Sequence, residues 1–325
     1  MEGILDYQDR SLLLTLIGAL LLLVGVAAAF LAPLEMYTFY FFSEGGRFHY
    51  AGFGFGSFMF GNIATQIMGY YTIALLAIPL GYGHLKARRW ARTLSVTLLW
   101  FWLVVGVPLV IIFFLILVST KELSLAAGLV AGILLAASYL AVPGLLIRFY
   151  ASRNVRLTFE HRDPNSYWTE RLPIPILVLC CLYLFYALVL HIPIFFRGVF
   201  PLFGMFVSGL RGIVLLDVSI LYLVLLTWGT LRLRAWAWWA AILYFGLLTI
   251  SSLVTLLGAS YADILAVMQF PARELEFLDG VPVQGVHFAV FIGIPLLLTL
   301  GVIILARPHF RGKKLVSDQK LVSDH

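Results

Sequence analysis

The sequence predicts an all-α, polytopic integral membrane protein whose eight transmembrane helices form two parallel four-helix repeats. Composition is the first reason. Of the 325 residues, 62% are hydrophobic and only 12% are charged, and the mean hydropathy is +0.99. Soluble domains carry roughly 25% charged residues. A water-soluble core is therefore excluded, and much of the apolar surface must face lipid.

Eight apolar runs are the second reason, because each reaches the ~20 residues that a spanning helix needs. They cover residues 11–34, 63–82, 94–118, 124–147, 173–196, 204–231, 236–258 and 286–306. The first run is too long for the roughly 7–15-residue hydrophobic region of a signal peptide, so we expect an uncleaved helix. Pro108 lies inside the third run and predicts a kink there.

Positive charge gathers in alternate loops, which is the third reason and which predicts the orientation. With eight spans, 17 of the 22 Lys and Arg residues fall on the side that holds both chain ends, and four fall on the other. Loops rich in Lys and Arg stay in the cytoplasm. We therefore expect cytoplasmic termini in a bacterial inner membrane. The cations between spans that we expect to meet anionic lipid are Lys86, Arg88, Arg89, Arg92, Arg232 and Arg234.

Two of the basic loops resemble each other closely enough to predict an internal duplication. When Trp90 of GYGHLKARRWAR is set against Trp236 of WGTLRLRAWAWW, Gly83 falls on Gly229. Each unit then holds four spans, an even number, so the two units share one orientation. The predicted divisions are a first repeat (1–148), a cytoplasmic connector (149–172), a second repeat (173–312) and a flexible C-terminal tail (313–325).

A segment rich in Phe, Tyr and Gly, residues 36–62, separates the first two spans. Aromatic rings favour the headgroup region and glycine allows tight turns, so one interpretation is an aromatic belt around an irregular interfacial loop. The other interpretation is a re-entrant segment that lines a cavity and binds a lipid, a pigment or a quinone. The candidate contact residues are Phe53, Phe55, Phe58 and Phe60.

Two further patterns predict packing. Gly128 and Gly132 in the fourth run are spaced as GxxxG, which lets two helix backbones approach closely, so we expect them to contact a neighbouring helix or a partner subunit. In the connector we expect a short interfacial helix with Phe149, Val155 and Phe159 directed toward lipid.

Charges inside spans are functional candidates because a charge in lipid is costly. Arg211 and Asp217 both lie in the sixth run. They are ~9 Å apart along a helix axis and about a third of a turn out of line, so an ion pair requires bent side chains. In one interpretation Arg211 reaches the outer interface and Asp217 bonds to a neighbouring helix. In the other, Asp217 is the centre of an ion, proton or substrate site, with Arg211, His191 or a partner chain as its counter-charge.

The sequence contains no recognisable catalytic or metal-binding pattern. HExxH, GxSxG and a phosphate-binding Gly-Lys loop are absent. The adjacent Cys180 and Cys181 suit neither a disulfide nor a metal site. The net charge of +6 is explained by loops that face anionic lipid, so we expect no nucleic-acid partner.

These observations favour a non-catalytic protein, either an accessory or scaffold subunit of a larger membrane complex or a lipid-binding helper. Aromatic, small-residue and interfacial features are abundant, whereas polar groups that converge within the membrane are scarce. We expect membrane lipids and other membrane subunits as partners, with bound lipid and no defined cofactor beyond the pigment or quinone left open above. The alternative is a secondary transporter or channel for a small or lipophilic solute that uses Asp217.

Overall fold

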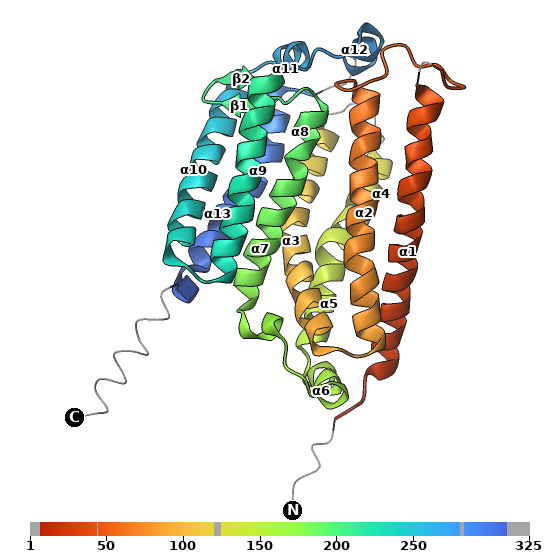
Figure 1. Cartoon of the computed structure of the whole chain (residues 1–325), viewed down its shortest axis with the longest axis vertical. Coiled ribbons are helices and arrows are strands. Elements are labelled where there is room, and N and C mark those ends of the chain that lie inside the picture. The colour runs from red at the N-terminus through yellow and green to blue at the C-terminus, as the bar shows by residue number, and fades with distance from the viewer. Residues whose placement is uncertain (1–6, 44, 120–124, 280–282, 311–325) are drawn as a thin grey trace, which may run out of the picture.

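The computed structural model of the chain describes residues 7–43, 45–119, 125–279 and 283–310. Within these residues, eight helices are long and apolar enough to cross a membrane, which confirms an all-α, polytopic membrane protein. They stand side by side in one bundle, and the start of α1 (Ser11–Phe42) lies at the same end as the end of α13 (Gly285–Leu305) (Figure 1). We call this the basic end and its counterpart the opposite end. The predicted tail, residues 313–325, lies outside the described residues.

The first half contains three continuous spans and one interrupted span. Its elements are α1, α2 (Phe58–Leu85), α3 (Arg89–Ser119), α4 (Leu125–Ala136), the π-helical turn η1 (Ala137–Ala141), α5 (Val142–Ala151), α6 (Arg153–Arg162) and η2 (Trp168–Arg171). The fourth span runs through α4, η1 and α5. Pro143 follows the π-helical turn and has no backbone N–H to donate, which accounts for a break in the regular hydrogen-bond pattern there.

Small residues let α1 and α2 pack as a close pair. A Cβ added at Gly25 would lie 2.7 Å from the Ile78 side chain and 2.9 Å from its backbone nitrogen. Gly18 and Gly81 approach each other in the same way, since a Cβ on either would come within 2.9 Å of the other's carbonyl oxygen. Between helices in lipid, van der Waals packing replaces the hydrophobic effect as the driving force. These glycines therefore stabilise the α1–α2 pair by letting the two backbones come close together.

The second half contains the main core of the bundle. Its elements are α7 (Ile174–Val189), α8 (His191–Phe195), β1 (Phe200–Leu202), β2 (Met205–Val207), α9 (Gly209–Leu231), α10 (Ala235–Gly258), α11 (Tyr261–Met268), α12 (Ala272–Asp279), α13 and η3 (Arg307–Phe310). Leu179, Tyr183, Leu226 and Phe245 meet in the core and are at most 1% exposed.

The sixth span begins later than predicted, and the boundary at residue 204 is wrong. Residues 205–207 pair with residues 200–202 in an antiparallel hairpin. Phe203 and Gly204 have positive φ angles of 42° and 93°, which is the backbone of a tight two-residue hairpin turn and not of a helix. The helix starts only after the second strand, at Gly209.

α3 joins the two halves. It contacts α7 and α13 on one side and α5 on the other, and the rings of Phe101 and Phe185 meet across the α3–α7 contact with centroids 5.3 Å apart. Figure 1 shows α1 and α2 at one edge of the bundle and α10 at the other, with α3 between them.

The two basic turns that predict the duplication have the same backbone geometry. In each turn a glycine makes room for a tryptophan of the next helix. A Cβ added at Gly83 would lie 2.9 Å from Trp90, and one added at Gly229 would lie 2.7 Å from Trp236. Each turn also passes through one residue in the left-handed region. These residues are Ala87, with φ 46°, and Leu233, with φ 51°.

The predicted connector helix exists as α6, but its predicted contact with lipid is wrong. Val155 and Phe159 are 0% exposed. They pack with Tyr150 and Leu14 under the first half of the bundle, and Phe149 is half-buried against the same cluster. An amphipathic helix buries its apolar face against the nearest apolar surface, and here that surface is protein.

Candidate functional site

Asp217 lies well inside a span, and its side chain faces outward. The residue is exposed on α9, and the neighbouring Val214, Val218 and Leu221 are 51%, 57% and 69% exposed. Eight residues at 1.5 Å each separate it from the start of the helix, so it lies about 12 Å along a helix of about 34 Å. The carboxylate therefore sits at lipid depth on an otherwise apolar face.

Neither predicted counter-charge reaches this carboxylate. Among the described residues, no ion pair or hydrogen bond involves Asp217. Arg211 is exposed in the first turn of α9, where a long side chain can extend to the headgroup region. His191 is half-buried, and its Nδ1 lies 2.8 Å from the carbonyl oxygen of Ala187 in α7. The three residues therefore do not form one site.

At the opposite end, a buried carboxylate of α12 caps α2. Glu274 is 3% exposed and accepts hydrogen bonds from the backbone amides of Phe58, at 2.6 Å, and Met59, at 3.0 Å. The Ser57 hydroxyl accepts from the Phe60 amide at 3.2 Å. The first amides of a helix have no partner within the helix, and a negative charge is favourable at that terminus. Glu274 thus ties the second half to the first.

Tyr50 lies beside this cap. The guanidinium of Arg273 lies over its ring, 5.1 Å from the centroid. Burial, together with the charge of Glu274, raises the pKa of Tyr50 above its ordinary value of 10.0, against the opposing effect of Arg273. The loop before α2 is thereby held by residues of α12.

The four candidate phenylalanines pack next to the same cap. The rings of Phe53 and Phe60 have centroids 6.0 Å apart, and so do those of Phe55 and Phe60. Phe58 stacks on Phe196, which follows α8, at 6.3 Å. Phe58 thus joins the start of α2 to the second half, the ring contacts of Phe53 and Phe60 lie within the first half, and Phe55 remains 54% exposed.

Gly128 and Gly132 are buried inside the chain. A Cβ added at Gly128 would collide with the side chain of Leu117, and one added at Gly132 would lie 3.0 Å from Phe114. Both neighbours belong to α3, so the GxxxG pattern serves an internal pair of helices. Neither glycine lies on the outer surface of α4.

Three of the six predicted lipid-contacting cations are only partly exposed and are bonded to other groups of the protein at the basic end. Arg88 pairs with Asp163 at 3.4 Å, and Arg89 pairs with Glu170 at 2.9 Å. The Nε of Arg92 donates to a backbone carbonyl at the end of α5 at 3.1 Å. The three that are exposed are Lys86, Arg232 and Arg234.

Asp163 of the connector caps α3. Its carboxylate is 0% exposed and accepts from the backbone amide of Arg89 at 3.2 Å. Burial acts to raise the pKa of Asp163, but the Tyr167 hydroxyl, the amides of Arg89 and Asn165, and the Arg88 guanidinium outweigh it. The pKa of Asp163 therefore lies below its ordinary value of 3.8, and the cap is ionised at neutral pH.

His84 is buried between α2 and α5, with 1% of its surface exposed. Its Nδ1 lies 2.7 Å from the Leu80 carbonyl, and its Nε2 lies 2.7 Å from the Tyr150 hydroxyl. A carbonyl can only accept, so Nδ1 carries a proton, and in the neutral ring Nε2 then accepts from the tyrosine hydroxyl. Both ring nitrogens are satisfied, which gives His84 a structural role.

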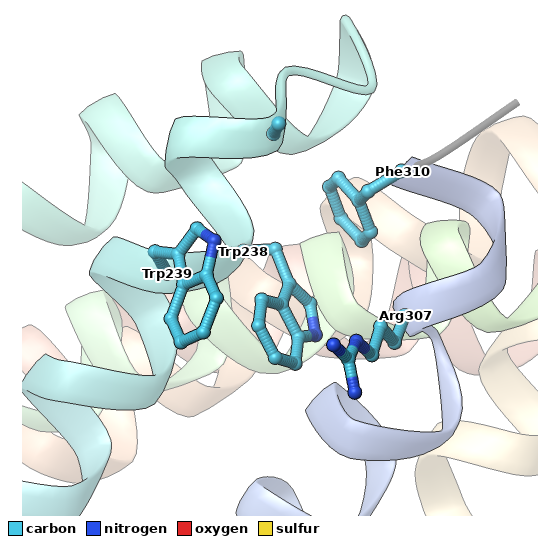
Figure 2. A pocket seen from close by; sticks show the side chains of 5 residues that line it. Trp238, Trp239, Arg307 and Phe310 are labelled. Atoms are coloured by element: carbon cyan, nitrogen blue, oxygen red, sulfur yellow. The ribbon is translucent and has the colours of Figure 1, made fainter. Parts of the chain in front are cut away.

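A pocket of about 60 Å³ lies at the basic end, where α10 begins and α13 ends. Its lining residues are Ala235, Trp238, Trp239, Arg307 and Phe310. Figure 2 shows the Trp238 indole between Trp239 on one side and Arg307 with Phe310 on the other. Trp238 is 8% exposed, and its Nε1 donates to the Ile303 carbonyl at 2.8 Å.

Comparison with protein families, curated proteins and solved structures finds no match for the chain. Within the described ranges, no group of three or more His, Cys, Asp or Glu side chains could hold a metal ion. We therefore infer its function from the geometry of the bundle itself.

Sequence reasoning missed Glu274, Asp163 and the pocket at Arg307. Each depends on a partner far away in the chain, such as Met59 for Glu274. The carboxylates stand among other loop charges, and nothing local distinguishes them. Only for the pocket was there a signal, since paired tryptophans beside a basic turn are typical of a headgroup contact.

Proposed function

We propose that this chain is a non-catalytic subunit of a larger membrane assembly, and that a transmembrane helix of a partner protein packs on the α9 face around Asp217. The exposed position of that carboxylate carries the proposal. An Asp at the centre of a membrane helix costs about 2.5–3.5 kcal/mol, and intramembrane charges usually pair or face a cavity. The hydrogen-bond donor missing from the described residues is then supplied by a neighbouring molecule.

The partner helix carries a cationic or hydrogen-bond-donating side chain at the depth of Asp217. A second copy of this chain fits this face less well. A symmetric dimer in a membrane is related by rotation about the membrane normal, which brings the two Asp217 carboxylates to the same depth. Like charges repel strongly where the dielectric constant is low, and Arg211 lies about 9 Å further along the axis. In the proposed complex, the partner helix also packs on the exposed apolar residues around Asp217, which are Val214, Val218 and Leu221.

We assign the basic end, and with it both termini, to the cytoplasm of a bacterial inner membrane. The exposed cations Lys86, Arg232 and Arg234 at that end support the assignment, because cytoplasmic loops are enriched in Lys and Arg and face anionic lipid. Bound anionic lipid is therefore part of the proposal.

We also infer that the two halves are parallel repeats. The shared turn geometry at Gly83 and Gly229 supports this. So does the order of packing, since α1 lies against α2 in the first half as α7 lies against α9 in the second. The second half departs from the first by its hairpin and by the short helices α11 and α12.

A transporter or channel that uses Asp217 would need this carboxylate to line a passage through the chain. Asp217 is instead exposed on the outer face of α9, and neither Arg211 nor His191 contacts it. We therefore favour docking over transport, and we assign the chain no catalytic step.

The proposal is tested by gentle detergent extraction of the protein from its source membrane, followed by native mass spectrometry. We expect a stoichiometric partner with the wild type, its loss in Asp217→Leu, and its retention in Asp217→Glu. Leu16→Ala is the control, because Leu16 is 58% exposed on α1, away from the proposed contact.

Misfolding is separated from loss of docking by the stability of the isolated chain. Replacing a lipid-facing Asp by Leu removes an unfavourable insertion energy of roughly 3 kcal/mol, so Asp217→Leu should be at least as resistant to heat as the wild type. A partner that stays bound to Asp217→Leu, or a wild-type protein that is extracted alone, would refute the proposal.

A further inference from the structure

We propose that the pocket formed by Trp238, Trp239, Arg307 and Phe310 binds the phosphate of an anionic phospholipid, with an acyl chain lying along α10. The site is at the basic end of the second half, where α10 begins and α13 ends. It rests on the anionic-lipid part of the proposed function, but it shares no residue with the α9 face around Asp217 and does not depend on the proposed docking.

The arginine of this pocket is held in place by an aromatic ring and, within the part of the chain that the structure describes, by no acidic group. Its guanidinium carbon lies 5.2 Å from the Trp238 ring centroid, and the ring is in turn fixed by its hydrogen bond to Ile303. Arg307 is exposed and takes part in none of the ion pairs within the described residues. A guanidinium presents five N–H donors in a planar fork that matches phosphate oxygens.

The chain segments that line the pocket carry only positive formal charge. Neither residues 228–240 nor residues 300–310 contain an Asp or a Glu. Arg232 and Arg234 are exposed on the turn just before α10. A volume of about 60 Å³ leaves room for a group such as a phosphate. The charge of the lining segments therefore favours an anion in this pocket.

An apolar stripe leads from the pocket along α10. Trp239 is 63% exposed, and Leu243, Leu247 and Ile250 are 62%, 48% and 56% exposed. Positions spaced by three and four residues lie on one face of a helix, so the stripe begins at the pocket wall and continues toward the opposite end. A headgroup pocket with an apolar stripe matches a phospholipid, whereas free phosphate would use only the pocket.

The test is native mass spectrometry of the purified full-length chain titrated with phosphatidylglycerol or phosphatidylcholine. We expect the wild type to prefer phosphatidylglycerol, and Arg307→Gln to bind it about tenfold more weakly, because a charge-assisted phosphate contact is lost. Trp239→Ala alters a pocket residue that is 63% exposed, and should weaken binding several-fold. Arg153→Gln, an exposed cation of α6 at the same end, is the matched charge control and should bind as the wild type does.

Several outcomes would overturn the proposal. Unchanged phosphatidylglycerol affinity in both Arg307→Gln and Trp239→Ala would remove the site. An equal loss in Arg153→Gln would show a general effect of charge. Displacement of the lipid by inorganic phosphate would show that the pocket takes the free anion and that the stripe contributes nothing. Retention of the lipid in excess inorganic phosphate supports the phospholipid.

Discussion

Replacing Glu274 by alanine is expected to release α12 from the first turn of α2. The carboxylate accepts from two backbone amides, those of Phe58 and Met59, at 2.6 and 3.0 Å. Alanine leaves both amides without an acceptor. They cannot bond within the helix, because the first turn has no preceding carbonyls.

The magnitude follows from the contacts. A hydrogen bond to a charged group contributes about 1.5–3 kcal/mol, and an anion at a helix N-terminus about 0.3–1 kcal/mol. Two such bonds give an upper bound near 6 kcal/mol. Water entering the loosened cap recovers part of this, so we expect a loss of about 3 kcal/mol, equivalent to a factor of about 100 in a local opening equilibrium. Glu274→Gln keeps one carbonyl oxygen as acceptor and should lose about half of that free energy.

Hydrogen–deuterium exchange of the purified protein measures this opening directly. In Glu274→Ala, the peptides that cover the start of α2 and α12 should exchange about 100-fold faster, with the remaining spans unchanged. Glu276→Ala serves as the control, because Glu276 is exposed on the same helix. Unchanged protection of Phe58 and Met59 in Glu274→Ala, or equal loosening in Glu276→Ala, would refute the reasoning.

Two further predictions concern the helix pair α1–α2 and the cap of α3. Gly25→Leu forces side-chain atoms against the Ile78 backbone. This overpacking should lower the free energy of unfolding by about 1–3 kcal/mol, and with it the thermal stability of the protein. Gly246→Ala is the control and should have no such effect, because the space around its Cβ is open. The pKa of Asp163 is lower in the folded protein than its ordinary value of 3.8. The ionised carboxylate therefore stabilises the fold fully at pH values above 3.8, and this stabilisation is lost as the pH falls through the pKa of the folded protein. Exchange at the start of α3 should therefore differ between wild type and Asp163→Asn at pH 7, and the difference should vanish in strong acid. The Asp163 prediction is wrong if the difference in exchange between wild type and Asp163→Asn persists at low pH. The Gly25 prediction is wrong if Gly246→Ala lowers the thermal stability as much as Gly25→Leu does.

The elements that sequence reasoning located well are those whose cause is local. The turn at Gly83 is an example, because a glycine next to a packed tryptophan and a residue in the left-handed region are all within one short loop. The start of α9 was misplaced because Phe203 and Gly204 are apolar or small, and hydropathy does not distinguish a hairpin from a helix.

The sequence predicted that a helix has an apolar face better than it predicted whether that face contacts protein or lipid. The pattern of α6 is amphipathic, yet Val155 and Phe159 are buried against protein and not lipid. Asp217 could have faced the interior or the lipid, since its neighbours Val214 and Val218 are apolar in either case. In a membrane protein both environments are apolar, so hydrophobic periodicity does not separate them.

The sequence by itself determined the class of protein, the eight spans and the alternation of basic loops, because hydropathy and charge act over one helix or one turn at a time. The tertiary structure decided which charges find partners. Glu274 and Asp163 became caps of α2 and α3, Arg307 became the polar wall of a pocket, and Asp217 was left on the outer face. The physical reason is that each of these outcomes depends on which distant backbone or ring comes within hydrogen-bond reach, and only the packing of the helices sets that.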